Sequence, residues 1–220
     1  RVAPARVPHG RTEGRRRAAF PLRFWLFLGG VTLFGLGDFS RTFLVWLAAQ
    51  AIGIDRPLGG GLLALPALLY MLHNLISALA AYPIGHVGDR RSKLAILLLG
   101  YGLGVGTNAL LALGAGSLVA LLVVIAFSGV YIAVEETLEK AVAAEMLPRD
   151  LRSLGFGLLA CVNAVGDMLS SLFVGYCLEV GWPPLGFGLA AVVGLLGWLW
   201  LLAMVGTRPS SPTKAESSPA

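Results

Sequence analysis

Long apolar stretches alternate with short polar segments along the whole chain. The apolar stretches cover about residues 24–52, 62–84, 94–113, 118–147, 154–177 and 185–205. Each has about 20 residues or more, which as an α-helix is enough to cross a hydrocarbon core about 30 Å thick. The pattern therefore predicts an all-α membrane domain with six transmembrane helices over residues 24–206.

Polar tails flank this domain on both sides. Residues 1–23 are basic, carry prolines and glycines and lack apolar periodicity, whereas residues 207–220 are rich in Ser and Pro. Both compositions are typical of disordered segments. The chain begins at Arg1 rather than Met, which indicates a fragment or a missing start.

The composition agrees with a membrane protein and sets its orientation. The chain is 56% hydrophobic and 13% charged, whereas soluble domains carry roughly 25% charged residues. The net charge of +5 lies in the tails and short loops rather than on a helical stripe, so we expect no nucleic-acid partner. If the amino tail is cytoplasmic, the outer loops hold only Arg56. The positive-inside rule then predicts a multi-pass protein of the plasma membrane, specifically a bacterial inner membrane, with both termini cytoplasmic.

Enzymatic and cofactor motifs are not recognisable in the sequence. Cys161 and Cys177 lack partners at metal-ligand spacing and are expected to be small core residues. The glycine series at 100–106 lacks G-x-G-x-x-G spacing and fits close helix packing better. Ser128-Gly129 lacks the rest of a serine-nucleophile motif. We therefore expect neither an enzyme nor a bound cofactor or metal, and primary transport driven by ATP is not indicated.

Polar residues within the spans follow a repeating order. The first span carries Asp38 and Arg41, and the fourth carries Glu135 and Glu136. The second span carries His73 and Asn74 near mid-depth, and the fifth carries Asn163 and Asp167. The third and sixth spans carry no charge. Since three is odd, the second triplet crosses the membrane in the opposite sense, as in inverted-topology repeats. We expect spans one and four to line a wet cavity, two and five to pack inside, and three and six to face lipid.

The charges in the first span have two interpretations. Asp38 and Arg41 are three residues apart and would share one helix face. They are either a coupling or substrate-binding pair, or an ion pair that satisfies itself; the sequence leaves both open. At 1.5 Å per residue, Asp38 and Asp167 each lie about 20 Å into their spans, near mid-membrane.

The fourth span carries its charges deeper toward the cytoplasm. Glu135 and Glu136 lie about 27 Å from Ser117 by the same rise, near the inner boundary. We favour Glu136 as a proton site and Glu135 as an interfacial residue. Replacement of Glu136 by Gln is expected to abolish proton-driven transport. The later charges Glu139, Lys140 and Glu145 are interpreted as a solvated helix end, and the uncharged polar groups His73, Asn74 and Asn163 as makers of interhelical hydrogen bonds.

Several short motifs resemble those of one transporter family. The segment Gly85-His-Val-Gly-Asp-Arg-Arg-Ser-Lys93 resembles the G-x-L-x-D-R-x-G-R-K loop of the major facilitator superfamily, with Val87 and Ser92 departing from it. Further similarity lies at Tyr70–Leu75, Tyr82–Gly85, Gly129–Thr137, Leu147–Arg152 and Gly155–Gly157. One departure is in the first span, where relatives show Asn-Ser-Ser-Asp and this chain has Asp38-Phe-Ser-Arg41.

The resemblance implies a chain of twelve helices in two halves, of which this is the carboxyl-terminal six-helix half. The basic segment before Phe24 would belong to the central cytoplasmic loop, and spans one and four would line the substrate cavity. In the loop motif, Asp89 would pair with a basic side chain or cap a neighbouring helix to gate the cavity, while the cations set topology; the motif residues are Gly85, Asp89, Arg90, Arg91 and Lys93.

The sequence thus predicts a secondary active transporter of small molecules, ion-coupled and with efflux as one possible direction. Its expected partners are the lipid bilayer, a small-molecule substrate, and an amino-terminal six-helix half or a second copy. The alternative is a self-standing six-helix membrane protein with a sensor or assembly role. Substrate, direction and coupling ion stay open.

Overall fold

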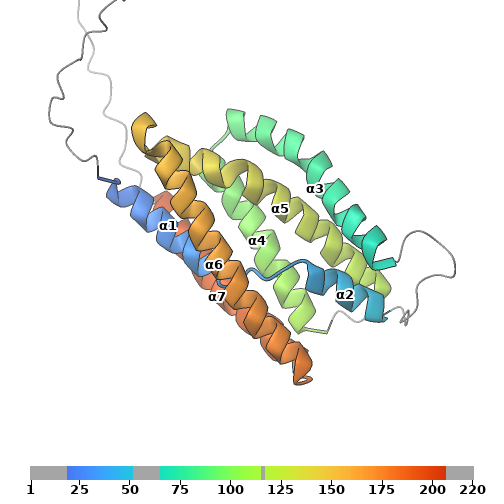
Figure 1. The fold of residues 1–220 in the computed structure, drawn as a ribbon. Helices are drawn as coiled ribbons and strands as arrows, with labels where there is room; N and C mark the ends of the chain where they lie inside the picture. The colour runs from blue at the N-terminus through green and yellow to red at the C-terminus, as the bar shows by residue number, and fades with distance from the viewer. Residues whose placement is uncertain (1–18, 52–64, 115–116, 207–220) are drawn as a thin grey trace, which may run out of the picture.

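The computed structural model describes residues 19–51, 65–114 and 117–206, and this part of the chain is all-helical without strands (Figure 1). Its helices are α1 Leu22–Gly35, α2 Thr42–Ala51, α3 Leu65–Arg90, α4 Lys93–Ala112, α5 Leu118–Met146, the short 3₁₀ turn η1 Arg149–Leu151, α6 Arg152–Glu179 and α7 Pro183–Gly206. The predicted loop at 53–60 and most of both predicted tails lie outside the described residues.

The helix ends have recognisable local causes. Ser92 and Ser117 cap α4 and α5, because their hydroxyls accept hydrogen bonds from backbone N–H groups three residues on. Gly181 follows α6 with φ +78°, a left-handed conformation that favours glycine. Pro183 opens α7 at a position where its missing N–H leaves no hydrogen bond unmade.

Five helices, α3 to α7, are long and apolar enough to cross a membrane among the described residues. The chain is therefore a multi-pass membrane protein whose environment is a lipid bilayer. The prediction of one continuous first span is wrong, because residues 36–41 are not helical and divide it into α1 and α2. Hydropathy alone does not separate a broken helix from a helix that carries charge.

The predicted charged turn at 85–93 is also mostly wrong. Helix α3 continues through Gly85 to Arg90, so that only Arg91 and Ser92 separate it from α4. Gly88 lets α3 approach α5 there, since a Cβ on it would lie 2.7 Å from a methyl group of Leu138. Gly88 is therefore a packing residue in this helix.

The helices pack in a bundle in which α4 contacts both α5 and α7, α1 contacts α6 and α7, and α3 contacts α5 (Figure 1). A large apolar cluster around Phe24, Phe27 and Leu97 fills one end, and a second cluster around Val174 and Phe187 fills the other. Close helix contacts need glycine: a Cβ on Gly197 of α7 would lie 2.7 Å from Phe34 Cα and 2.9 Å from Gly30 O.

Two tryptophans of α7 bond to the backbone of neighbouring helices. Trp198 Nε1 donates to Leu98 O of α4 at 2.7 Å, and Trp200 Nε1 donates to Leu26 O of α1 at 2.8 Å. Both indole N–H groups are thereby satisfied in an apolar setting. These bonds attach α7 to α4 and α1.

Burial does not follow the predicted order. The most apolar windows of α3 and α6 are only 17% and 22% buried, against 44% for α4, 50% for α5 and 33% for α7. The expectation that the second and fifth spans pack inside is wrong for this chain by itself. Polar groups within a span mark where hydrogen bonds are needed, but they do not measure how much of a helix its neighbours cover.

Candidate functional site

The break between α1 and α2 is held by side chains from two other helices. Asn108 of α4 donates from Nδ2 to Gly37 O at 2.9 Å, and Ser171 of α6 accepts from Ser40 N at 2.9 Å. Gly37 lies against α7, where a Cβ would come within 2.6 Å of Gly194 N. Two backbone groups of the break, Gly37 O and Ser40 N, therefore have side-chain partners on α4 and α6, and these bonds help to fix the break in place.

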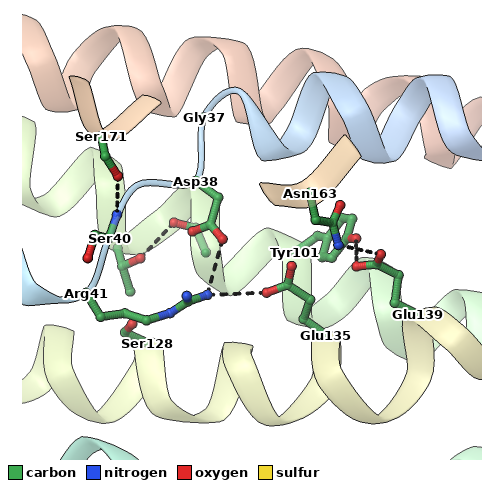
Figure 2. Close-up of polar contacts among 12 residues, drawn as sticks. Gly37, Asp38, Ser40, Arg41, Tyr101, Ser128, Glu135, Glu139, Asn163 and Ser171 are labelled. Carbon is green, nitrogen blue, oxygen red and sulfur yellow. Dashed lines mark hydrogen bonds and ion pairs between the residues drawn. The ribbon is translucent and has the colours of Figure 1, made fainter. Parts of the chain in front are cut away.

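Arg41, at the end of this break, lies between two carboxylates (Figure 2). Its Nη2 is 3.2 Å from Asp38 Oδ2 and 3.4 Å from Glu135 Oε2 of α5. The side chains are 27%, 12% and 15% exposed for Arg41, Asp38 and Glu135. The expectation that Asp38 and Arg41 share a helix face is wrong, since both lie in the non-helical segment, although the two do pair.

The contact with Arg41 bears on the predicted depth of Glu135 in the membrane. The sequence placed Glu135 near the inner boundary and Asp38 near mid-membrane, but one guanidinium joins them. Helix α5 has 29 residues, more than a span needs, so its depth cannot be counted from Ser117 alone. Counted back from Met146, Glu135 lies about 16 Å into the helix, similar to Asp38. Arg41 therefore brings Glu135 and Asp38 together, although the sequence predicted different depths for them.

Glu139, one turn further along α5, is buried and fully bonded (Figure 2). It is 3% exposed, accepts a hydrogen bond from Tyr101 Oη of α4 at 2.8 Å, and accepts another from Asn163 Nδ2 of α6 at 2.7 Å. Its assignment to a solvated helix end is wrong. The four-residue spacing from Glu135 was the available signal, because residues i and i+4 share a helix face.

Replacing Tyr101 by Phe should cost about 1.5–3 kcal/mol of the free energy of unfolding, since it removes a hydrogen bond to a buried carboxyl group. The ring of Tyr101 stacks on Phe34 with centroids 3.7 Å apart, and Phe keeps that contact. Reversible chemical unfolding of the purified protein in detergent measures the effect. Tyr82→Phe is the matched control, because Tyr82 is 82% exposed; equal stability of the two variants would contradict the role of the bond.

A cavity of about 300 Å³ opens beside this cluster. Its charged lining comprises Arg41, Glu135, Glu136, Glu139, Lys140 and Asp167. Glu136, the favoured proton site of the sequence, is exposed and makes no hydrogen bond or ion pair within the described residues, whereas Glu135 is the one held by Arg41. Asn163 lines the cavity as well. Because Arg41 belongs to the first predicted triplet and the acidic lining residues to the second, the structure brings charges of both triplets together.

The other predicted polar residues lie away from this cavity. His73 Nε2 and Ser128 Oγ of α5 are 3.1 Å apart, a hydrogen bond between α3 and α5. Asn74 is exposed and donates to Tyr70 O of its own helix at 2.8 Å, so the expectation of an interhelical bond is wrong for it. Asn74 lies on an exposed face of α3.

The loop motif has one ion pair among the described residues. Lys93 Nζ lies 2.7 Å from Glu145 Oε1 at the ends of α4 and α5. Asp89, Arg90 and Arg91 are exposed without an ion pair in this part of the chain. A Cβ atom added to Gly85 would lie 3.5 Å from a methyl group of Thr137. The gating role of the motif stays a prediction.

Cysteines and acidic residues do not form a metal centre in the described ranges, where no group of three or more His, Cys, Asp or Glu side chains is arranged to hold an ion. Cys177 is buried as expected of a core residue, whereas Cys161 is exposed, which corrects the expectation for it. Cys161 lies on the poorly covered face of α6.

Comparison with known proteins agrees with this architecture. The family model of the Major Facilitator Superfamily matches residues 26–220. An uncharacterized MFS-type transporter of Methanocaldococcus jannaschii is 25% identical over 186 residues, which cover 83% of this chain and 45% of the relative. The crystal structure of an auto-inhibited POT family peptide transporter superposes with a TM-score of 0.61 at 14% identity, over 89% of this chain and 39% of that one. The chain thus spans less than half the length of these proteins.

Proposed function

Because the chain belongs to the major facilitator superfamily, we propose that it is the carboxyl-terminal six-helix half of a secondary active transporter of small molecules. Its coverage of 45% and 39% of longer transporters supports a half. In this proposal α1 and α2, with 14 and 10 residues, together form the first span and complete a set of six, because their joint length of about 36 Å is enough to cross a bilayer core.

Helix packing supports two inverted three-helix repeats. Take α1–α2, α3 and α4 as one repeat and α5, α6 and α7 as the other. In this division α1–α2 corresponds to α5, α3 to α6, and α4 to α7. The contacts of one repeat then have counterparts in the other: α1–α7 corresponds to α5–α4, and α1–α6 to α5–α3. The contact between α4 and α7 corresponds to itself, and the chain has all of these contacts. Such repeats place substrate sites where they meet, which is where the cavity lies.

The exposed faces of α3 and α6 would be covered by the amino-terminal half. Met71, Leu75, Leu79 and Tyr82 are all more than half exposed and recur at helical spacing on α3. Met168, Leu172 and Tyr176 form a similar stripe on α6, each also more than half exposed. Apolar stripes on two helices of one bundle favour a partner of matching shape, and rocking of two halves about a central site would alternate its access.

Ion coupling is carried by one observation, the guanidinium of Arg41 shared between Asp38 and Glu135. Arginine stays protonated in proteins, so Arg41 does not carry the exchangeable proton, and the carboxylates paired with it are the candidates. A proton on Glu135 would leave Arg41 paired with Asp38 alone and free α5 from the break between α1 and α2. We assign the proton to Glu135, with Asp167 and Glu136 as further cavity groups and Asp89 in the gate.

The remaining parts of the proposal concern location. The scarcity of basic residues in the outer loops supports an inner membrane protein with cytoplasmic termini, and residues 1–23 and 207–220 would be its cytoplasmic segments. Members of this family are transporters, so we propose no enzymatic activity and no cofactor.

Replacing Glu135 by Gln should reduce proton-driven accumulation of solute to the level of vesicles without the protein. The measurement uses energised membrane vesicles that contain the full-length protein, with accumulated solutes identified by mass spectrometry and a protonophore as reference. Asp150→Asn, an exposed position on η1, is the control and should transport normally.

Two results would contradict parts of this proposal. Normal protonophore-sensitive transport by the Glu135→Gln protein would remove Glu135 as the proton carrier. No accumulation of any solute by the unmodified protein would favour a self-standing six-helix protein with a sensor or assembly role, in which a second copy covers α3 and α6.

A further inference from the structure

We propose that the cavity beside Arg41 takes a small organic cation, such as a protonated amine with an apolar body. The proposal rests on the transporter function proposed above and names its substrate class. It follows from the balance of charge around the cavity, from the cation that carboxylates and an aromatic ring already hold beside it, and from the character of its α6 wall.

Acidic groups outnumber basic ones around the cavity. Its lining has four carboxyl groups against the two cations Arg41 and Lys140, and when Glu135 carries the proton proposed above, the carboxylate of Asp38 still pairs with Arg41. Asp167 has neither a hydrogen bond nor an ion pair to any described residue. A cleft lined by an excess of one charge concentrates solutes of the opposite charge.

Tyr131 lies behind the cavity, next to the ion pairs of Arg41. The residue is 3% exposed, and its hydroxyl group is directed at the carboxylates of Asp38 and Glu135. The side chain is an electrostatic neighbour of both Asp38 and Glu135, and its ring centroid lies 6.0 Å from Arg41 Cζ. Carboxylates and an aromatic face thus already hold one cation, the guanidinium of Arg41, next to the cavity.

The opposite wall fits the apolar part of such a molecule. Helix α6 lines the cavity with Leu159, Ala160 and Ala164 along with Asn163 and Asp167. Small apolar residues next to a single carboxylate are typical of sites that orient a ligand by one charge and bury the rest. Asp167 would hold the ammonium group, and the apolar body would lie against the alanines.

The preference for cations can be measured without knowing the substrate. In the full-length protein with Cys161→Ser, a cysteine placed by Ala164→Cys reports access to the cavity, because Ala164 is exposed and lines it. The probes are 2-(trimethylammonium)ethyl and 2-sulfonatoethyl methanethiosulfonate in detergent solution. The measured quantity is the ratio of the labelling rate of the cationic probe to that of the anionic probe. This ratio should be at least about tenfold higher for Ala164→Cys than for a free thiol in solution.

Two substitutions should shift this ratio in opposite directions. Asp167→Asn removes a carboxylate and should lower the ratio several-fold, whereas Lys140→Gln removes a cation and should raise it. Asp150→Asn, distant from the cavity on η1, should leave it unchanged. A ratio at or below that of the free thiol in the Ala164→Cys protein would overturn the proposal even if the Asp167→Asn protein did not fold.

The vesicle experiment separates this proposal from the transport function. Accumulated solutes that carry a net positive charge support both. Accumulation of neutral or anionic solutes only would overturn the cation site and leave the transporter standing. If no solute accumulates, the transporter proposal fails, and the labelling ratio still decides whether the cavity selects cations.

Discussion

Replacing Arg41 by Gln should lower the free energy of unfolding by about 3–5 kcal/mol, the cost of leaving a buried charge without its partner. Asp38 and Glu135 are 12% and 15% exposed, and both would lose their cation at once. Chemical unfolding of the purified protein in detergent measures the loss. The control is Arg149→Gln, because Arg149 is exposed on η1 and forms no ion pair within the described chain.

A second substitution shows whether the loss comes from unbalanced charge. Adding Glu135→Gln to Arg41→Gln removes one of the two stranded carboxylates, so the double variant should regain part of the lost stability. If Arg41→Gln were as stable as Arg149→Gln, the cluster would be a solvated group of charges rather than a structural centre. The same result would weaken the proposed coupling through Arg41.

Replacing Gly197 by Ala should destabilise the protein by about 1–3 kcal/mol, the usual cost of adding a methylene group to a tightly packed interior. The new Cβ would meet backbone atoms of α1, at 2.7 Å from Phe34 Cα and 2.9 Å from Gly30 O. Backbone atoms cannot rotate away as side chains do, so α1 and α7 must move apart. The readout is the same unfolding measurement.

Gly106→Ala on α4 is the matched control for this prediction. A Cβ on Gly106 would find nothing within 4 Å, and alanine is favoured over glycine in a helix by about 1 kcal/mol. The control variant should therefore be as stable as the unmodified protein or more so. If Gly197→Ala were as stable as Gly106→Ala, the close α1–α7 contact would not constrain position 197.

Sequence reasoning located the long helices well and the broken one poorly. Uncharged stretches such as 94–113 and 185–205 predict membrane helices, because a helix satisfies its own backbone hydrogen bonds in lipid. Helices α4 and α7 have nearly these bounds. The break at 36–41 depends on partners distant in sequence, Asn108 and Ser171, which satisfy its backbone. Periodicity within one span carries no information about such partners.

The candidate site was recovered as a group of spans but misread in detail. The charges of the first and fourth spans do meet, because Arg41 contacts Glu135. Counting depth from one end of α5 misplaced Glu135, and the charge-rich sequence at 135–145 concealed that Glu139 points inward to Tyr101. A helix longer than the membrane needs a second reference point, which only its neighbours supply.

The two indole bonds of α7 have a consequence for sequence drift in this protein. Trp198 and Trp200 donate to the backbone carbonyls of Leu98 and Leu26, not to their side chains. Almost any residue at positions 98 and 26 keeps its carbonyl, so exchange there leaves the attachment intact if the packing volume is kept. Loss of either indole ring cannot be offset by a change in the partner, because the partner offers only its backbone. Positions 26 and 98 should therefore tolerate substitutions of similar volume, whereas Trp198 and Trp200 should not tolerate replacement.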